Sequence, residues 1–278
     1  MQRVFSRLIE IVACALPQRQ IKTVFEVGAR DCVESALFAA AYPQATVFAF
    51  ECNPATLPAC RAVAAANPRV KLTEKAVSDR AGVIAFYPTD PARSVTGTPD
   101  LVAGASSMFV ATGKYPEETY VQNQIEVEAI TLADFMHANA ILAIDLMWMD
   151  VQGAELLVLA GLGERTRDVA CVHMEVEFFE IYQGQALFGG VHAKMTAAGF
   201  MLAGFSSYSR YAADAVYFRV ELGVSRLGLW RRHPYLLRNW RKMLQHRCKR
   251  WLLRTIGRPE WPAPKSTLPN QQQLNPQD

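Results

Sequence analysis

From Thr23 to Val220, short apolar runs alternate with stretches of helical pattern. Strands that are buried on both faces have continuous apolar runs, because helices cover the sheet on each side. The alternation therefore predicts an α/β fold with a mostly parallel sheet of about seven strands and helices on both faces. The last two runs predict a hairpin. The clearest strand candidates are residues 23–27, 45–51, 70–77, 142–151, 168–177, 199–206 and 214–220.

The segment from residue 82 to residue 130 interrupts this alternation. It begins and ends with strand-like runs, 82–88 and 123–130, and its middle is rich in Ser, Thr, Gly and Pro. A loop of this length inside a compact domain is usually functional. We expect residues 88–123 to form a lid or a wall of the substrate site.

The pattern predicts four parts in the chain. Residues 1–20 form an amphipathic helix that Pro17 ends. The main α/β domain covers residues 21–221, and a basic helical tail covers residues 222–258. Residues 259–278 are rich in Pro, Gln and Asn, and we expect them to be disordered.

Charge separates the tail from the main domain. Residues 1–221 carry 17 Lys and Arg against 24 Asp and Glu, whereas residues 222–278 carry 12 against 2. An acidic body argues against nucleic acid as the main substrate. The tail needs an explanation of its own.

The six cysteines form no CxxC pair and no cluster with zinc spacing. This pattern argues against a disulfide framework and against structural zinc. No apolar stretch reaches the roughly 20 residues that span a bilayer, and Arg7 and Glu10 interrupt any signal-peptide core. We expect a cytoplasmic protein.

Acidic residues stand at four of the predicted strand ends: Glu26, Glu51, Asp150 and the pair Glu175 and Glu177. Ligands of open α/β sheets bind beyond the carboxyl ends of the strands. Glu51 follows Gly28 by 23 residues, close to the spacing at which a carboxylate binds an adenosine ribose. The alternative is that Glu51 is a solvated acid at the strand end.

The turn after Gly28 limits the choice of adenosine ligand. Arg30, Asp31 and Cys32 stand where a dinucleotide site has glycines that let a pyrophosphate approach the backbone. The turn is therefore unfavourable for NAD or FAD, which argues against a nicotinamide oxidoreductase. S-adenosylmethionine has no phosphate; Asp31 or Glu26 would bind its ammonium group, and Arg30 or the turn amides its carboxylate.

Several segments together resemble the FkbM family of S-adenosylmethionine-dependent methyltransferases: VFEVGARDCVES, AFECNP, KAVSD, the Ser106–Ser107 pair, ITLADF and above all WMDVQGAELLVLAGL. The resemblance covers roughly residues 22–219. It implies a seven-stranded class I methyltransferase (Rossmann-like) fold and O-methylation of a hydroxyl on a sugar, glycan or secondary metabolite. Trp148 stands where this family often has Lys, and Cys32 where it often has Gly.

The resemblance also implies site residues. Glu26, Gly28, Arg30 and Asp31 match the cofactor loop, Glu51 the ribose acid and Ala76 the adenine edge. Asn53 and Ser107 lie in the matching segments AFECNP and Ser106–Ser107, and we include them among the cofactor-binding candidates. The two serines could instead simply belong to a flexible loop.

Methyl transfer to an alcohol benefits from a base that removes the hydroxyl proton. Asp150 is the first candidate, because it follows a central strand beside Gly153. Glu175 and His173 come next, although His173 could be a packed strand residue. Glu155 either orients a ligand or interacts with the dipole of its helix. We expect no metal ion.

The tail pairs Trp and Leu with arginines at helical spacings, as in helices that bind membrane surfaces. One hypothesis is that residues 226–258 contact an anionic membrane and bring the enzyme to a lipid-linked glycan. The alternative is packing on the domain or on a partner copy in an oligomer, and nucleic-acid binding is a weaker third. A non-catalytic membrane-associated binding module is the main alternative to an enzyme.

Overall fold

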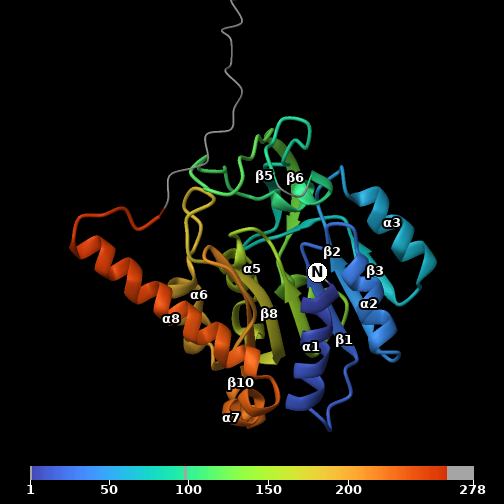
Figure 1. Ribbon diagram of the computed structural model, residues 1–278. Coiled ribbons are helices and arrows are strands. Elements are labelled where there is room, and N and C mark those ends of the chain that lie inside the picture. Colours follow the sequence, from blue (N-terminus) through green and yellow to red (C-terminus); the bar gives the residue numbers. More distant parts are fainter. Residues whose placement is uncertain (1, 97–98, 262–278) are drawn as a thin grey trace, which may run out of the picture.

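The computed structural model describes residues 2–96 and 99–261 and is built around a seven-stranded sheet (Figure 1). The strand order is β3-β2-β1-β7-β8-β10-β9. All neighbouring strands are parallel except that β10 is antiparallel to β8 and β9. This order confirms the expected class I methyltransferase fold, including the final hairpin. The strands are β1 (Thr23–Val27), β2 (Thr46–Phe50), β3 (Val70–Thr73), β7 (Ile144–Met149), β8 (Val169–Glu177), β9 (Phe200–Tyr208) and β10 (Ala212–Arg219).

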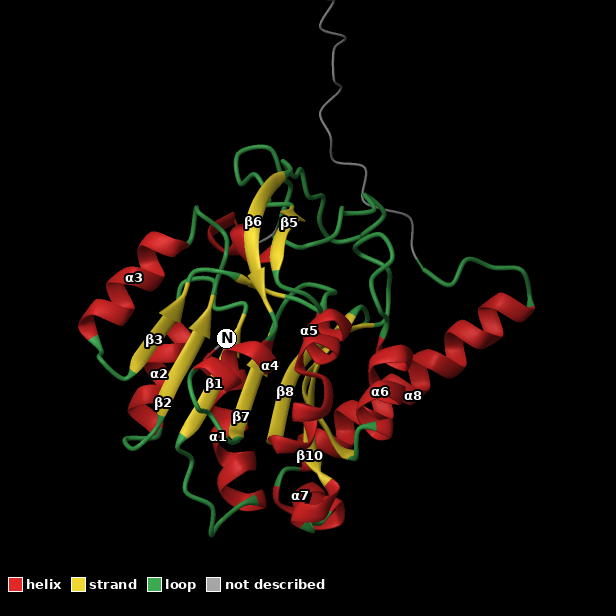
Figure 2. Cartoon of the chain, turned by 180° about the vertical axis from the view of Figure 1, so that it is seen from behind, coloured by secondary structure: helices red, strands yellow, loops and turns green. Residues whose placement is uncertain are grey.

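Helices cover both faces of this sheet (Figure 2). Successive strand residues point to opposite faces, so Val24 packs in one core cluster and Phe25 in the other. One cluster includes residues of α4 (Leu132–Ala138), α5 (Glu155–Leu162) and α6 (Phe188–Ala197). The other includes residues of α1 (Gln2–Ala15), α2 (Val33–Ala41), α3 (Leu57–Ala66) and α7 (Arg226–Arg232).

The predicted strand 70–77 is in fact two strands in two sheets. β3 ends at Thr73, and β4 (Ala76–Val77) joins a small sheet of order β4-β6-β5 with β5 (Gly82–Phe86) and β6 (Ile125–Ile130). The chain bends at Glu74 and Lys75, and the Lys75 ammonium pairs with Glu128 of β6 at 2.7 Å. The small sheet stands above the carboxyl end of the main sheet (Figure 1). The small sheet and the loop that contains the 3₁₀ segment Pro99–Ala105 form one wall over the strand ends.

The basic tail forms α7 and the long helix α8 (Pro234–Thr255). The first half of α8 packs against β9. Asn239 donates a hydrogen bond to the Phe205 carbonyl at 2.9 Å, and the Trp240 ring stacks on Phe205 with centroids 5.8 Å apart. Gly204 has φ +145°, and a Cβ there would lie 2.9 Å from the Leu236 Cβ, so glycine permits this close approach. The first half of α8 is therefore packed on the domain.

Other expectations can be compared with the described residues. α1 ends at Ala15, just before Pro17, and buries Leu8 and Ile11. All six cysteines are free. Among residues 2–96 and 99–261, no helix combines the length and apolar character needed to cross a membrane. Most of the segment that we expect to be disordered, residues 262–278, lies outside the described residues.

Candidate active site

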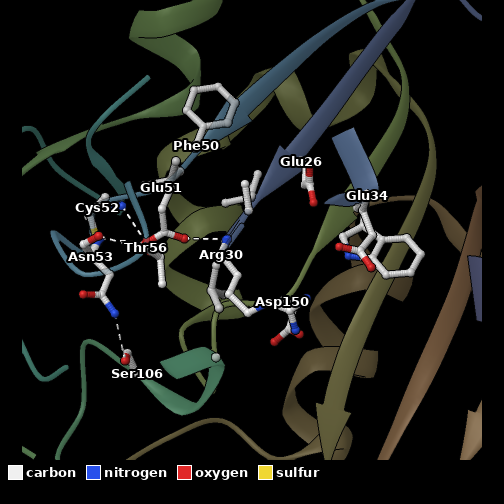
Figure 3. A pocket seen from close by; sticks show the side chains of 18 of the residues that line it. Glu26, Arg30, Glu34, Phe50, Glu51, Cys52, Asn53, Thr56, Ser106 and Asp150 are labelled. Atoms are coloured by element: carbon white, nitrogen blue, oxygen red, sulfur yellow. Dashed lines mark hydrogen bonds between the residues drawn. The ribbon is translucent and has the colours of Figure 1, made fainter. Parts of the chain in front are cut away.

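A cavity of about 280 Å³ lies at the carboxyl ends of β1, β2 and β7. Its apolar lining includes Phe50, Ala76, Val77, Phe86 and Met108, and its acidic lining consists of Glu26, Glu34, Glu51, Asp150, Glu175 and Asp214. Arg30 and Lys75 supply the positive charges. Figure 3 shows Glu51 and Asn53 on one side, Glu26 and Glu34 on the other, and Arg30 between them.

The turn after β1 brings two strand ends together. The backbone N–H groups of Gly28 and Ala29 both donate to the Phe50 carbonyl at 3.0 Å. Gly28 has φ +83°, and a Cβ there would lie 1.9 Å from the Asp150 carbonyl oxygen. Only glycine fits this contact, which sets the cofactor turn directly against the Asp150 segment.

Glu51 is held by the backbone around it. Its carboxylate accepts hydrogen bonds from the N–H groups of Arg30 at 2.7 Å, Cys52 at 2.9 Å and Asn53 at 2.7 Å (Figure 3). Its residue exposure is only 8%, and burial raises the pKa of the carboxyl while these backbone bonds oppose that rise. A carboxylate fixed in this way is a preorganised acceptor, which a freely solvated acid is not.

Arg30 and Asp31 differ in their position relative to the cavity. Arg30 lines the cavity in a left-handed backbone conformation, and its guanidinium contacts Asp31 at 2.9 Å. Asp31 is not in the cavity lining, and its carboxylate accepts from the Val33 N–H at the start of α2. Asp31 therefore pairs with Arg30 and with the first turn of α2, whereas Glu26, the other candidate for the ammonium group, lines the cavity. Cys32, also left-handed, is fully buried beneath the turn.

Gln152 connects the two leading base candidates. Its side-chain amide donates to Asp150 at 2.6 Å and to Glu175 at 2.8 Å. The Tyr182 hydroxyl lies 2.9 Å from the Gln152 side-chain oxygen, and Ser107 donates to the Gln152 carbonyl at 2.7 Å. Burial raises the pKa of Asp150 and raises that of Glu175 well above its ordinary value; the charge of Asp150 adds to the second shift. The two carboxyls titrate as an interacting pair.

His173 does not reach the cavity lining. Its ring stacks on Trp148 with centroids 4.2 Å apart, and its Nε2 lies 2.9 Å from the Ser206 hydroxyl. Burial lowers its pKa to about 3, so the ring is neutral at physiological pH. Trp148 lines the cavity where the family often has Lys. These contacts favour the alternative for His173, a packed strand residue.

Ser107 is also absent from the lining. It is buried and joins the loop backbone at Phe109 to Gln152. Its neighbour Ser106 does line the cavity and accepts a hydrogen bond from the Asn53 side chain at 3.2 Å (Figure 3). Ser106, one residue earlier, therefore faces the cavity and Ser107 does not, because adjacent loop residues point in different directions.

The sequence analysis did not identify three of the charged lining residues. Glu34 lies in the first turn of α2, Lys75 at the bend before β4, and Asp214 near the start of β10. None of them ends a parallel strand, so the rule that pointed to Glu26, Glu51 and Asp150 could not find them. Asp214 pairs in register with Glu175 across β8 and β10, which is how it reaches the site.

Glu155 and Glu177 lie outside the cavity lining and are both buried. Burial raises the pKa of Glu155 to about 7, and its carboxylate accepts the Gly153 N–H at 3.2 Å. This contact favours the structural interpretation of Glu155. No other described residue donates to either carboxylate oxygen of Glu177, and burial raises its pKa well above the ordinary value.

Glu177 should therefore make folding depend on pH. Because its folded-state pKa is raised, its contribution is fully present below the unfolded value of about 4.3 and is lost as pH rises. Thermal unfolding followed from about pH 5 to about pH 8 should show stability falling, at up to about 1.4 kcal/mol per pH unit for one proton. Glu177→Gln should reduce this slope, and the exposed-site control Glu164→Gln should not. Equal slopes in wild type and Glu177→Gln would contradict the assignment.

No group of three or more His, Cys, Asp or Glu side chains is placed to hold a metal ion within the described ranges. The lining suits S-adenosylmethionine better than a dinucleotide. Glu51 offers a buried, oriented carboxylate for a ribose, beside an apolar wall that includes Phe50 and Phe86. The Arg30 side chain lies in the cavity next to the turn where a pyrophosphate would need open backbone.

The strand order and this cavity define a class I methyltransferase with its site at the carboxyl ends of the central strands. A model of the methyltransferase FkbM domain matches residues 26–202. The chain belongs to the FkbM family and is an S-adenosylmethionine-dependent methyltransferase.

The chain is also similar to individual proteins. The 2-O-methyltransferase NoeI of Sinorhizobium fredii (strain NBRC 101917 / NGR234) is 30% identical over 175 residues, which are 62% of this chain and 70% of NoeI. Among solved structures, a precorrin-6y C5,15-methyltransferase from Geobacter metallireducens GS-15 aligns with a TM-score of 0.42 at 10% identity, covering 76% of this chain and 87% of its own. The fibrillarin pre-rRNA processing protein of Methanococcus jannaschii gives 0.43 at 11% identity, with 74% and 73% covered.

Proposed function

We propose that this protein transfers a methyl group to a hydroxyl oxygen of a sugar, glycan or secondary metabolite. The observation that carries the proposal is the Asp150–Gln152–Glu175 arrangement, which joins two carboxyls through one amide in the cavity that Glu51 also lines. The similarity to a 2-O-methyltransferase supports oxygen as the acceptor atom. The family membership supports an enzyme over a non-catalytic binding module.

The cofactor supplies an activated methyl group when bound. In our proposal Glu51 accepts hydrogen bonds from the ribose hydroxyls, and the wall around Ala76 packs on the adenine. Asn53 fixes the edge of this wall through its bond to Ser106. The amino-acid end lies toward the turn, where Glu26, Gly28 and Arg30 line the cavity. Ser35 donates to the Glu26 carboxylate and so holds it in place.

Asp150 acts as the base. It accepts the hydroxyl proton while the acceptor oxygen bonds to the methyl carbon and the methyl–sulfur bond breaks. Gln152 orients Asp150, and the partner carboxyl Glu175 shares the same amide. A base with a raised pKa takes the proton more readily at neutral pH than an ordinary aspartate does.

Two measurements test the proposal. Isothermal titration should show a heat of binding with S-adenosylmethionine and with S-adenosylhomocysteine. No heat of binding with either compound would contradict the proposed function. Incubation with methyl-labelled cofactor and fractionated glycans should label a glycan fraction at an alkali-stable, oxygen-linked position. Binding without any labelling of hydroxyl acceptors would reject the sugar or glycan acceptor while leaving the cofactor site intact.

A further inference from the structure

The second half of α8 leaves the body of the molecule. In Figures 1 and 2 the helix extends beyond α6, and its carboxyl end stands away from the sheet. The last side chain of α8 that is nearly fully buried is Met243. Beyond it, Leu244, Trp251 and Leu252 are 42%, 69% and 54% exposed. Within residues 2–96 and 99–261, no segment covers these large apolar side chains fully.

The exposed apolar side chains share one stripe. Leu244 and Trp251 are seven residues apart, which is about two turns of an α-helix, and Cys248 and Leu252 lie within about 100° of both around the helix. The half-buried Leu237, two turns before Leu244, lies on the same line. The body-facing side at the same level is already occupied. The Arg250 guanidinium lies over the Trp261 ring at 4.6 Å, and that ring packs on Phe179 at 5.2 Å. The stripe therefore faces away from the domain.

Positive charges border the stripe. α8 carries seven Lys and Arg and no acidic residue. At 100° per residue, Arg247 and Arg254 lie on one flank of the stripe and Lys242 and Lys249 on the other, while Arg241 lies within the stripe. Arg254 also pairs with Glu260 at 3.7 Å. A second copy of such a helix would be repelled by the same charges. A nucleic acid would satisfy the cations and leave the leucines exposed.

We propose that residues 244–255 of α8 dock on the surface of an anionic lipid bilayer, with Leu244, Trp251 and Leu252 in the interface and the flanking cations on lipid headgroups. An interfacial helix has this combination of an apolar stripe, an aromatic residue and basic flanks. Only the outward side of the second half takes part, since the first half is committed to β9. The docking is independent of which acceptor the enzyme methylates.

Vesicle sedimentation of the full chain tests the docking. The protein should sediment with vesicles of phosphatidylcholine and phosphatidylglycerol and stay in solution with phosphatidylcholine alone, and added salt should release it. Lys249→Gln should weaken binding about fivefold, the equivalent of about 1 kcal/mol per basic residue. Lys71→Gln, an exposed lysine of β3, should have no effect. Equal binding to both vesicle types, or equal effects of the two variants, would overturn the proposal.

A second pair of variants tests the apolar contacts with the bilayer. Leu252→Gln should weaken binding, whereas Leu142→Gln, which changes a leucine that is 83% exposed on the domain, should not. Vesicles should shift the tryptophan emission to the blue in wild type, and Trp251→Leu should lose this shift. Two results would contradict a lipid partner: concentration-dependent dimers that Leu252→Gln abolishes, and stronger binding to homopolymeric RNA than to anionic vesicles.

Discussion

Replacing Asp150 by Asn should lower turnover by about 10²- to 10⁴-fold while cofactor affinity stays close to that of wild type. Asparagine keeps the shape and an oxygen that can accept the Gln152 amide, so the local structure should survive. It cannot take up the hydroxyl proton. Turnover under saturating cofactor, with binding of S-adenosylhomocysteine measured in parallel, separates the two effects.

The pH dependence gives a second readout of the same group. Burial raises the Asp150 pKa above its ordinary value of 3.8, so turnover should fall as pH drops through that raised value and protonates the base. The acid limb should change in Asp150→Asn. Glu175→Gln is the comparator, because the two carboxyls share the Gln152 amide. A larger loss in Glu175→Gln than in Asp150→Asn would move the base assignment to Glu175.

Replacing Glu51 by Gln should weaken cofactor binding by about 10²-fold. Hydrogen bonds to a charged group contribute about 1.5 to 3 kcal/mol each, and a ribose would lose at least one of them along with the charge. The new amide would also point donor hydrogens at backbone N–H groups of Arg30 or Asn53, which now donate to the carboxylate. Titration with S-adenosylhomocysteine measures the loss directly.

Glu74→Gln is the matched control for Glu51→Gln. Glu74 lies just after β3, where it pairs with Arg61 on the surface. Its replacement should leave affinity unchanged, because surface ion pairs contribute little. Thermal unfolding of both variants checks that each is folded. Unaltered affinity in a folded Glu51→Gln protein would show that the ribose does not bind at this carboxylate.

Several features of the site were predictable because they follow from local periodicity. An apolar run that ends in an acid places that acid at the carboxyl edge of a parallel sheet, and Glu26, Glu51 and Asp150 all line the cavity there. The spacing from Gly28 to Glu51 corresponds to one βαβ unit. Gly28 itself was identifiable from the turn, although its contact with the Asp150 carbonyl was not.

Other features needed contacts between distant segments. His173 and Glu175 stand two residues apart on β8, yet His173 packs on Trp148 and only Glu175 lines the cavity. The Asp31 side chain pairs with Arg30, and Ser106, not Ser107, lines the cavity. A residue-by-residue pattern carries no information on which neighbour a loop side chain will meet.

The sequence by itself determined the α/β class, the order of its main elements, the acid Glu51 at the end of the second strand and the basic, acid-free tail, because periodicity, spacing and charge are properties of neighbouring residues. The tertiary structure decided that residues 70–77 divide between two sheets, that Gln152 joins Asp150 to Glu175, and that only the second half of α8 stays uncovered. These outcomes depend on packing between segments far apart in the chain. Such packing is settled only when the whole core assembles.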